Sequence, residues 1–232
     1  MSKRIPLSKR ILYEDNHLIV VNKLPSEIVQ GDKTGDKPLS EEVKYYLKKK
    51  YNKPGNVFTG VIHRLDRPVS GIVVFAKTGK ALSRMNELIK KRKIKKTYWA
   101  IVKNKPKEKE AVLTHFLLRN EKRNKSFVSN KKQENSKEAI LSYRLIASSK
   151  EYHLLEVDLQ TGRHHQIRAQ LAAIGSPIKG DLKYGFSRSN KDASISLHAH
   201  SVSFVHPVKN EALTIVANPP ADVLWKFFND RM

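Results

Sequence analysis

Residues 63–71 read HRLDRPVSG and place one acidic side chain, Asp66, between two arginines, Arg64 and Arg67. Guanidinium groups on both sides hold such a carboxylate in its ionised form. An ionised carboxylate at neutral pH suits a nucleophile or a general base. A purely structural Asp–Arg pair has the same spacing, so the segment alone leaves both interpretations open.

A second segment, residues 162–168, reads GRHHQIR at the start of a predicted helix. Gly162 permits a sharp turn into that helix. The free N–H groups of its first turn, together with Arg163, Gln166 and Arg168, would bind a phosphate or another anion. The same residues would also serve if they only capped the helix.

The histidines do not predict a metal site. His164 and His165 are adjacent at the predicted helix start, so we expect their side chains to point about 100° apart. His198 and His200 share one face of a predicted strand, but the local sequence supplies no third ligand. The chain has no cysteine, which excludes disulfides, thiolate nucleophiles and iron–sulfur clusters.

Charge indicates a polyanionic partner. The 232 residues include 45 Lys and Arg against 22 Asp and Glu, a formal net charge of +23. Six of the seven residues from 90 to 96 are basic, and we expect no local i,i+4 acidic partner for them. A solvated helix face is the alternative, but contact with a nucleic-acid backbone explains the cluster better.

Cofactor motifs are missing. No two glycines lie two residues apart, which excludes the dinucleotide fingerprint, and Val61 stands where a phosphate-binding loop requires Lys after Gly60. We predict no cofactor. The apolar run at residues 72–76 is far shorter than the roughly 18 residues that span a bilayer. The first ten residues lack the apolar core of a secretory signal, so we expect a cytoplasmic protein, although their basic, acid-free composition leaves organellar targeting as an alternative.

The elements that must position these residues alternate irregularly between strands and helices. We expect strands at 11–13, 18–21, 57–62, 71–77, 94–102, 112–118, 142–146, 154–159, 196–205 and 212–216. We expect helices after Ser40, over 80–92 behind a Thr78 cap, from Arg163 to Gly175, and around Trp225 and Phe228. This order predicts an α+β fold on a mixed, mainly antiparallel sheet flanked by helices and loops.

No linker or repeat divides the chain, so we expect a single catalytic domain over residues 11–232 after a basic extension at 1–10. Residues 119–137 carry seven basic and two acidic side chains and predict a flexible or hairpin insertion. No heptad pattern indicates a coiled-coil partner, and we expect a monomer.

Long motifs in this chain resemble the RluA-type pseudouridine synthases. HRLDRPVSGIVVFAKT is similar to the family signature HRLDxxTSG followed by a strand ending in AKT. GRHHQIRAQLAAIGSPIKGDLKYG is similar to GRxHQIRxHLAxxGxPIxGDxxYG, and YEDNHLIVVNK, KKTYWAIV and LHAHSVSFVHP also match in the family's order. Val69, Gln170 and Leu24 depart from the usual Thr, His and Pro.

The resemblance implies an RNA pseudouridine synthase that isomerises uridines in structured ribosomal or transfer RNA without a cofactor. It implies that Asp66 attacks the anomeric carbon or abstracts the 2′ proton, that Arg168 pairs with this carboxylate, and that Tyr98 stacks on the uracil. Arg64 would fill the space of the flipped base. The expected substrate and RNA contacts are His63, Arg64, Arg67, Arg163, His165, Gln166, Lys93, Lys95 and Lys96.

Two other functions are alternatives to this one. A non-catalytic RNA-binding or ribosome-assembly protein on the same fold would not need Asp66, Tyr98 and Arg168 together. A methyltransferase would need a glycine-rich cofactor loop that the chain lacks. The resemblance also implies no separate N-terminal RNA-binding module, since about ten residues precede the first predicted strand.

Overall fold

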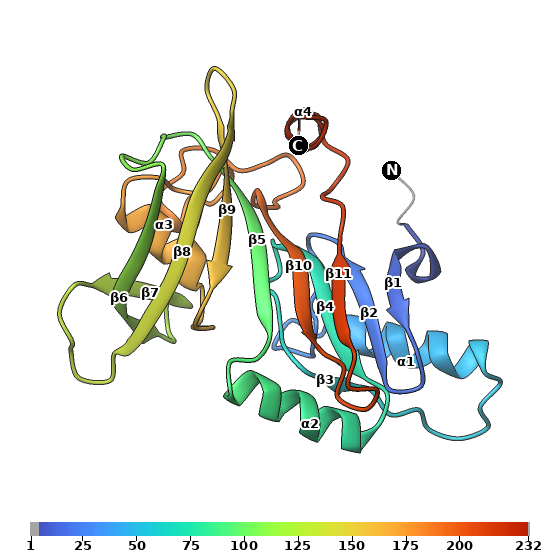
Figure 1. Ribbon diagram of the computed structural model, residues 1–232. Coiled ribbons are helices and arrows are strands. Elements are labelled where there is room, and N and C mark those ends of the chain that lie inside the picture. Colours follow the sequence, from blue (N-terminus) through green and yellow to red (C-terminus); the bar gives the residue numbers. More distant parts are fainter. Residues whose placement is uncertain (1–4, 232) are drawn as a thin grey trace. The chain divides into compact units, whose positions relative to one another are not determined.

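The computed structural model describes residues 5–231. They form two compact units, one of residues 5–94 and 200–218 and the other of residues 95–199 and 219–231. We call these the first and the second unit. Figure 1 shows the chain coloured from its N-terminus to its C-terminus. That residues 11–232 form a single catalytic domain stays a prediction.

The first unit is built on antiparallel strands. Strands β1 (Ile11–Glu14), β2 (Leu18–Lys23) and β4 (Ser70–Ala76) lie side by side, and β3 (Gly60–Val61) pairs with β4. Strand β10 (Leu197–Val205), which belongs to this unit from residue 200 onward, forms a hairpin with β11 (Ala212–Val216). The turn between β1 and β2 is fixed by the Asp15 carboxylate, which accepts the N–H groups of His17 and Leu18 at 2.8 Å each. All seven residues of β4 are buried, which explains their continuous apolar sequence.

Three helical segments belong to the first unit: a 3₁₀ turn at Leu7–Arg10, α1 (Leu39–Lys50) and α2 (Gly79–Lys90). The predicted Thr78 cap is confirmed, because its hydroxyl accepts the N–H of Ala81 at 3.2 Å. The expected Ser40 cap is wrong. Helix α1 begins at Leu39, and the N–H groups of Leu39 and Ser40 are already bonded to the carbonyls of Ile28 and Val29.

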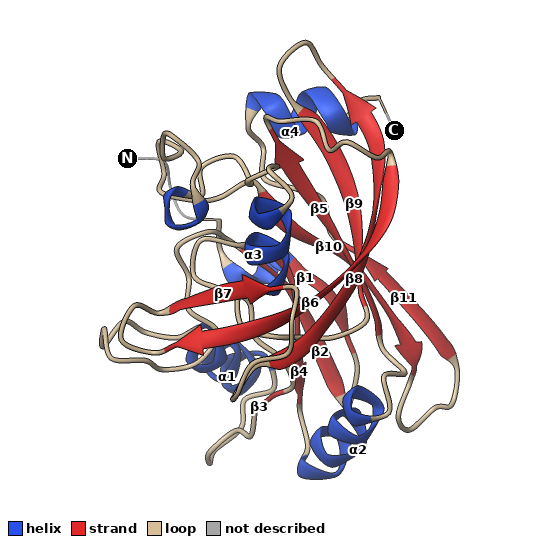
Figure 2. Ribbon diagram, turned by 90° about the vertical axis from the view of Figure 1, so that its left-hand side faces the viewer, coloured by secondary structure: helices blue, strands red, loops and turns tan. Residues whose placement is uncertain are grey.

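In the second unit the strand order is β5 (Lys95–Val102), β9 (His153–Leu159), β8 (Lys137–Ser148), β6 (Glu110–Asn120) and β7 (Lys125–Ser129), all antiparallel. The basic segment 119–137 is thus largely the β6–β7 turn, β7 and the link to β8. Helix α3 (Gln166–Ala173) packs against β6 and β7 (Figure 2). A 3₁₀ turn at Leu182–Tyr184 follows.

Helix α4 (Val223–Asn229) closes the apolar core of the second unit. Its N-terminus is capped by Asp222, whose carboxylate accepts the N–H groups of Leu224 and Trp225. Trp225 and Phe228 pack with Trp99, Ile101 and Leu154 of β5 and β9. The predicted α+β fold on a mainly antiparallel sheet is confirmed.

Several predicted boundaries are wrong. The strand expected at residues 142–146 begins earlier, since β8 starts at Lys137. Of the strand expected at residues 57–62, only Gly60 and Val61 pair with β4. The helix expected from Arg163 begins at Gln166, because His165 has a left-handed backbone with φ of 53°. Residues 163–165 therefore form a turn.

Candidate active site

The loop that carries Asp66, residues 62–69 between β3 and β4, is held through its main chain; we call it the Asp66 loop. The Lys23 ammonium donates to the carbonyls of Leu24 at 2.9 Å, Arg67 at 3.1 Å and Val69 at 2.6 Å. The N–H of Ser26 also donates to the Arg67 carbonyl, at 2.9 Å. Lys23 is fully buried at the end of β2, so one side chain fixes the backbone on both sides of the loop's turn.

Burial lowers the pKa of Lys23 to about 7, while the charges of Glu27 and Asp66 act in the opposite direction. In the unfolded chain this amine titrates near 10.4. Between these values the unfolded state binds a proton that the folded state does not, so the free energy of unfolding rises with pH.

We expect Lys23→Met to remove this pH dependence. The difference in unfolding free energy between wild type and variant should grow by up to about 1.4 kcal/mol per pH unit between about pH 7 and pH 10. Urea unfolding at a series of pH values measures it. A difference that is constant with pH would show that Lys23 keeps its charge throughout this range.

The Asp66 loop presents its side chains in different ways. Asp66 is half-buried, and its carbonyl accepts the N–H of Val69 at 3.0 Å, which closes a tight turn. Arg64 is exposed, whereas the Nε2 of His63 accepts the N–H of Val74 at 3.2 Å. Arg64 therefore reaches solvent.

Arg67 ties the loop to the preceding segment. Its guanidinium group contacts the Asp36 carboxylate at 2.6 Å, the Thr34 hydroxyl at 2.7 Å and the Asp32 carboxylate at 3.4 Å. These groups are exposed or nearly so, and the contacts contribute little to stability. They do order residues 32–36 beside the Asp66 loop.

In the second unit, Arg168 forms a buried two-point ion pair with Asp181. Its Nε lies 2.7 Å from one carboxylate oxygen and its Nη2 lies 2.8 Å from the other. Arg168 is 5% exposed and Asp181 is 1% exposed. The Tyr184 ring lies 5.1 Å from the guanidinium carbon. Arg168 is thus held rigidly from one side, and its expected pairing with Asp66 stays a prediction.

A histidine network supports Arg168 from the turn before α3. The His164 and His165 rings stack at 3.7 Å with 22° between their planes. The expected 100° divergence is wrong, because these residues lie in the turn before the helix. The Nδ1 of His165 lies 3.0 Å from the Tyr184 hydroxyl, which accepts the N–H of Ser126 at 2.8 Å. His165 is buried, and its expected contact with RNA stays a prediction.

Two glutamines of α3 act inside the second unit. The Gln166 side chain accepts the hydroxyl of Thr161 and the N–H of Arg163 and donates to the carbonyl of Ile140. Gln170, where the family usually has His, is fully buried and donates to the carbonyls of Leu113 and Ala139 at 3.1 Å each. This departure is therefore used to attach α3 to β6 and β8.

Arg163, half-buried in the same turn, donates from Nε to the carbonyl of Glu138 at 2.8 Å. Strand β5 carries Tyr98, which is 7% exposed and paired with Val157 of β9. Tyr98 is thus fixed by its strand.

Burial lowers the pKa of Lys96, whose ammonium lies close to the backbone of Gly162.

The basic segment 90–96 has acidic partners that sequence alone missed. Lys91 pairs with Glu87 at i,i+4 and 3.1 Å, and Lys95 pairs with Asp158 at 3.4 Å. The expectation that no i,i+4 partner exists is wrong. Lys93 is exposed, and its contact with RNA stays a prediction together with those of Lys95 and Lys96.

Gly180, which precedes Asp181, has a left-handed backbone with φ of +86°. A Cβ atom there would lie 2.8 Å from the carbonyl oxygen of Ser194. We expect Gly180→Ala to lower the free energy of unfolding by about 1–3 kcal/mol and to reduce activity by displacing Asp181. Gly31→Ala is the control, since a Cβ at Gly31 meets nothing within 4 Å. Equal unfolding curves for both variants would contradict the prediction.

Across residues 5–231 no three His, Asp or Glu side chains come together in a way that could hold a metal ion. His198 is buried against Trp225, and His200 lies 3.1 Å from the carbonyl of Ala217. In the same part of the chain, every helix is too short or too polar to cross a membrane.

Residues 17–173 match the protein family described as RNA pseudouridylate synthase. The chain belongs to this family. The synthase is 32% identical over 240 residues to tRNA pseudouridine synthase C of Vibrio parahaemolyticus, covering 95% of this chain and 94% of the relative. It is also 32% identical over 234 residues to ribosomal large subunit pseudouridine synthase D of Zymomonas mobilis, covering 96% and 72%.

The fold of the synthase is that of human RNA pseudouridylate synthase domain containing 4. The TM-score is 0.82 at 23% identity, over 97% of this chain and 94% of the human one. The expected membership of the RluA-type family is confirmed, and the catalytic interpretation is supported over a non-catalytic RNA-binding protein. The protein is a pseudouridine synthase.

Three residues of the synthase were not assigned from the sequence although they lie in matched motifs. Lys23 ends the YEDNHLIVVNK segment, and Asp181 and Tyr184 belong to GDLKYG. The sequence did show Lys23 at the end of an apolar strand and Asp181 directly after a glycine, and both features could have indicated a structural role. The loop partners of Lys23, Arg67 and Val69, lie 44 and 46 residues along the chain, and Arg168 lies 13 residues before Asp181, so the spacing alone did not reveal these pairs.

Proposed function

We propose that the synthase isomerises specific uridines in structured transfer or ribosomal RNA, with Asp66 as the catalytic group. The relatives named for these two RNA classes support this substrate choice. The observation that carries the proposal is the Asp66 loop itself. It offers a half-buried carboxylate on a backbone fixed by Lys23 and Ser26.

The proposed reaction breaks the bond between the ribose C1′ and uracil N1, turns the base over, and joins C1′ to C5. The proton at C5 is then lost, so no atom other than protons is exchanged with solvent. Asp66 either attacks C1′ or removes the 2′ proton. Tyr98 stacks on the uracil, and Arg168 pairs with Asp66.

Access to a paired uridine requires base flipping, which costs a few kcal/mol. We propose that Arg64 fills the vacated space, because it is the exposed arginine beside Asp66. The rest of the proposed RNA interface consists of contacts to the RNA phosphates from Arg67, Arg163, Lys93, Lys95 and Lys96. His63, His165 and Gln166 support the Asp66 loop and the turn before α3.

Tritium release tests this function. Transcripts of transfer RNA and of large-subunit ribosomal RNA are labelled at C5 of uridine and incubated with the protein. We expect release from at least one of them, and mapping of the product then identifies the site. RNA binding without release from either transcript or from total cellular RNA would overturn the proposal.

Reversing charge at Lys90, Arg92 and Lys93 tests the expected contribution of this segment to binding. Each lost phosphate contact should make the slope of log K against log salt less negative by about 0.7–0.9. We measure RNA affinity over a salt series. An unchanged slope would remove these residues from the interface.

We also propose that the synthase acts as a monomer in the cytoplasm, with residues 11–232 as its catalytic domain. Sedimentation at working concentration tests the first point. A dimer that persists on dilution would contradict it.

A further inference from the structure

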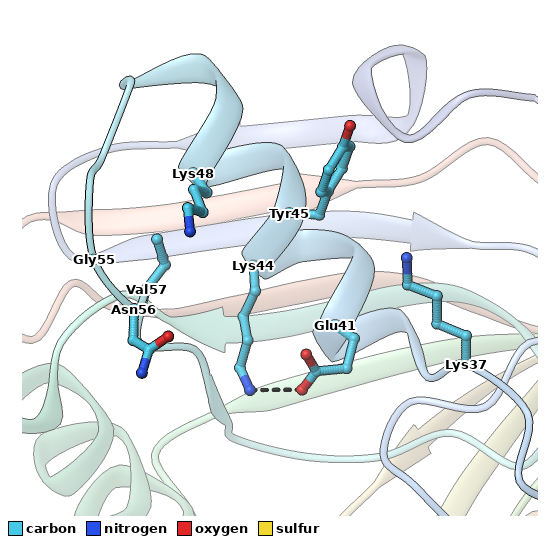
Figure 3. A pocket seen from close by; sticks show the side chains of 8 residues that line it. All are labelled: Lys37, Glu41, Lys44, Tyr45, Lys48, Gly55, Asn56 and Val57. Carbon is cyan, nitrogen blue, oxygen red and sulfur yellow. Dashed lines mark hydrogen bonds and ion pairs between the residues drawn. The ribbon is translucent and has the colours of Figure 1, made fainter.

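A pocket of about 500 Å³ lies in the first unit between α1 and residues 55–57 (Figure 3). Its charged lining comprises Lys37, Lys44 and Lys48 against one acidic residue, Glu41. The pocket therefore carries a net positive charge. None of these residues belongs to the Asp66 loop.

Helix α1 presents this face because its other face is buried. Leu39, Val43 and Leu47 are at most 1% exposed. Residues 41, 44, 45 and 48 are spaced three and four apart and lie together on the opposite side. The helix is also fixed at its end, where the Glu14 carboxylate accepts the Lys50 ammonium at 2.8 Å and the Tyr51 hydroxyl at 2.7 Å. The C-terminal end of α1 is thus attached to Glu14 of β1.

The lysines of the pocket differ in how far they are neutralised. Lys44 pairs with Glu41 at 2.5 Å, the contact drawn in Figure 3. Lys48 reaches toward Val57 in the same view. Among the residues that the structure describes, neither Lys37 nor Lys48 has a carboxylate within ion-pair distance. Two ammonium groups therefore remain for an anionic ligand.

Exposed aromatic rings accompany these charges. Tyr45 lines the pocket and is 63% exposed, with the Lys37 ammonium 5.6 Å from its ring centroid. Phe58 follows the pocket segment and is 46% exposed. Lysines beside exposed aromatic rings are the combination that binds single-stranded nucleic acid, since the rings stack on bases and the ammonium groups contact phosphates.

We propose that this face of α1 is a second RNA site, which binds a single-stranded stretch of the substrate RNA by stacking a base on Tyr45 and by contacting its phosphates through Lys37 and Lys48. The proposal rests on the proposed function for the identity of the RNA. Asn56, which also lines the pocket, offers an amide to a base edge. An acidic protein segment would engage the lysines but would not need the ring of Tyr45.

Two probes separate stacking from charge: a short fluorescent oligouridine and an abasic strand of equal length. We expect Tyr45→Leu to weaken oligouridine binding by about 5- to 150-fold and to leave the abasic strand unaffected. Tyr45→Phe keeps the ring and should bind as wild type does. The double variant Lys37→Gln with Lys48→Gln should bind both probes more weakly. The slope of log K against log salt should become less negative by about 0.7 for each lost contact.

Lys150→Gln with Lys226→Gln is the charge control, because both lysines are exposed and belong to the second unit. Equal oligouridine affinity for wild type and Tyr45→Leu would overturn the RNA site. A loss of affinity in the charge control as large as that in the pocket variant would do the same. Tritium release by wild type is measured in parallel, so a failure of the proposed reaction is seen independently of these affinities.

Discussion

Asp66→Asn is expected to reduce tritium release from uridine-labelled RNA by at least about 10³-fold, because the amide is neither a nucleophile nor a base at neutral pH. RNA affinity should stay close to wild type, and the variant should still fold with a small loss of stability, since the Asp66 charge favours the Lys23 ammonium. The main chain of the Asp66 loop is held by Lys23 and Ser26, and neither contact uses the Asp66 side chain.

The first unit provides a matched control for this change. Asp36→Asn also removes one carboxylate, at a residue that contacts Arg67 and is exposed. We expect Asp36→Asn to retain activity within a few fold. If Asp66→Asn and Asp36→Asn lose activity equally, Asp66 is not the catalytic group.

Asp181→Asn is expected to lower the free energy of unfolding by about 3–5 kcal/mol and to abolish activity. The substitution removes the carboxylate that holds Arg168 at two points inside the second unit. One of the guanidinium donors would then face an amide N–H₂ group instead of an oxygen. Urea unfolding gives the stability, and tritium release gives the activity.

The double variant Arg168→Met with Asp181→Leu separates the two effects. Replacing both members of a buried ion pair by apolar residues is often neutral for stability. We expect the double variant to recover most of the stability lost in Asp181→Asn and to remain inactive, because Arg168 is gone. Recovery of activity in the double variant would remove Arg168 from the catalytic machinery.

Local signals predicted much of the fold. The hairpin at Asp15 and helix α2 behind Thr78 depend on contacts within a few residues, which the sequence displays directly. The start of α3 was missed because His165 adopts a left-handed backbone, and nothing in the sequence indicates this conformation for a residue other than glycine. The division into two units has no signal in composition.

The candidate site was predicted in part. The resemblance pointed to Asp66, Tyr98 and Arg168 as a set. What it did not supply were Lys23, which holds the Asp66 loop, and Asp181, which holds Arg168. The first contact joins residues 46 apart in the chain, and the second joins residues 13 apart. The stacking of His164 on His165 was likewise unpredictable without the turn that produces it.

Because Lys23 holds the Asp66 loop through hydrogen bonds to its main chain, substitutions within the loop need not break these contacts. Its three bonds reach only carbonyl oxygens, which every amino acid provides. These bonds do not depend on the side chains at 67 and 69, so they are compatible with Val69 in place of the usual Thr. A loop held through its main chain can change its side chains, and with them its substrate preference, while its catalytic carboxylate keeps its position.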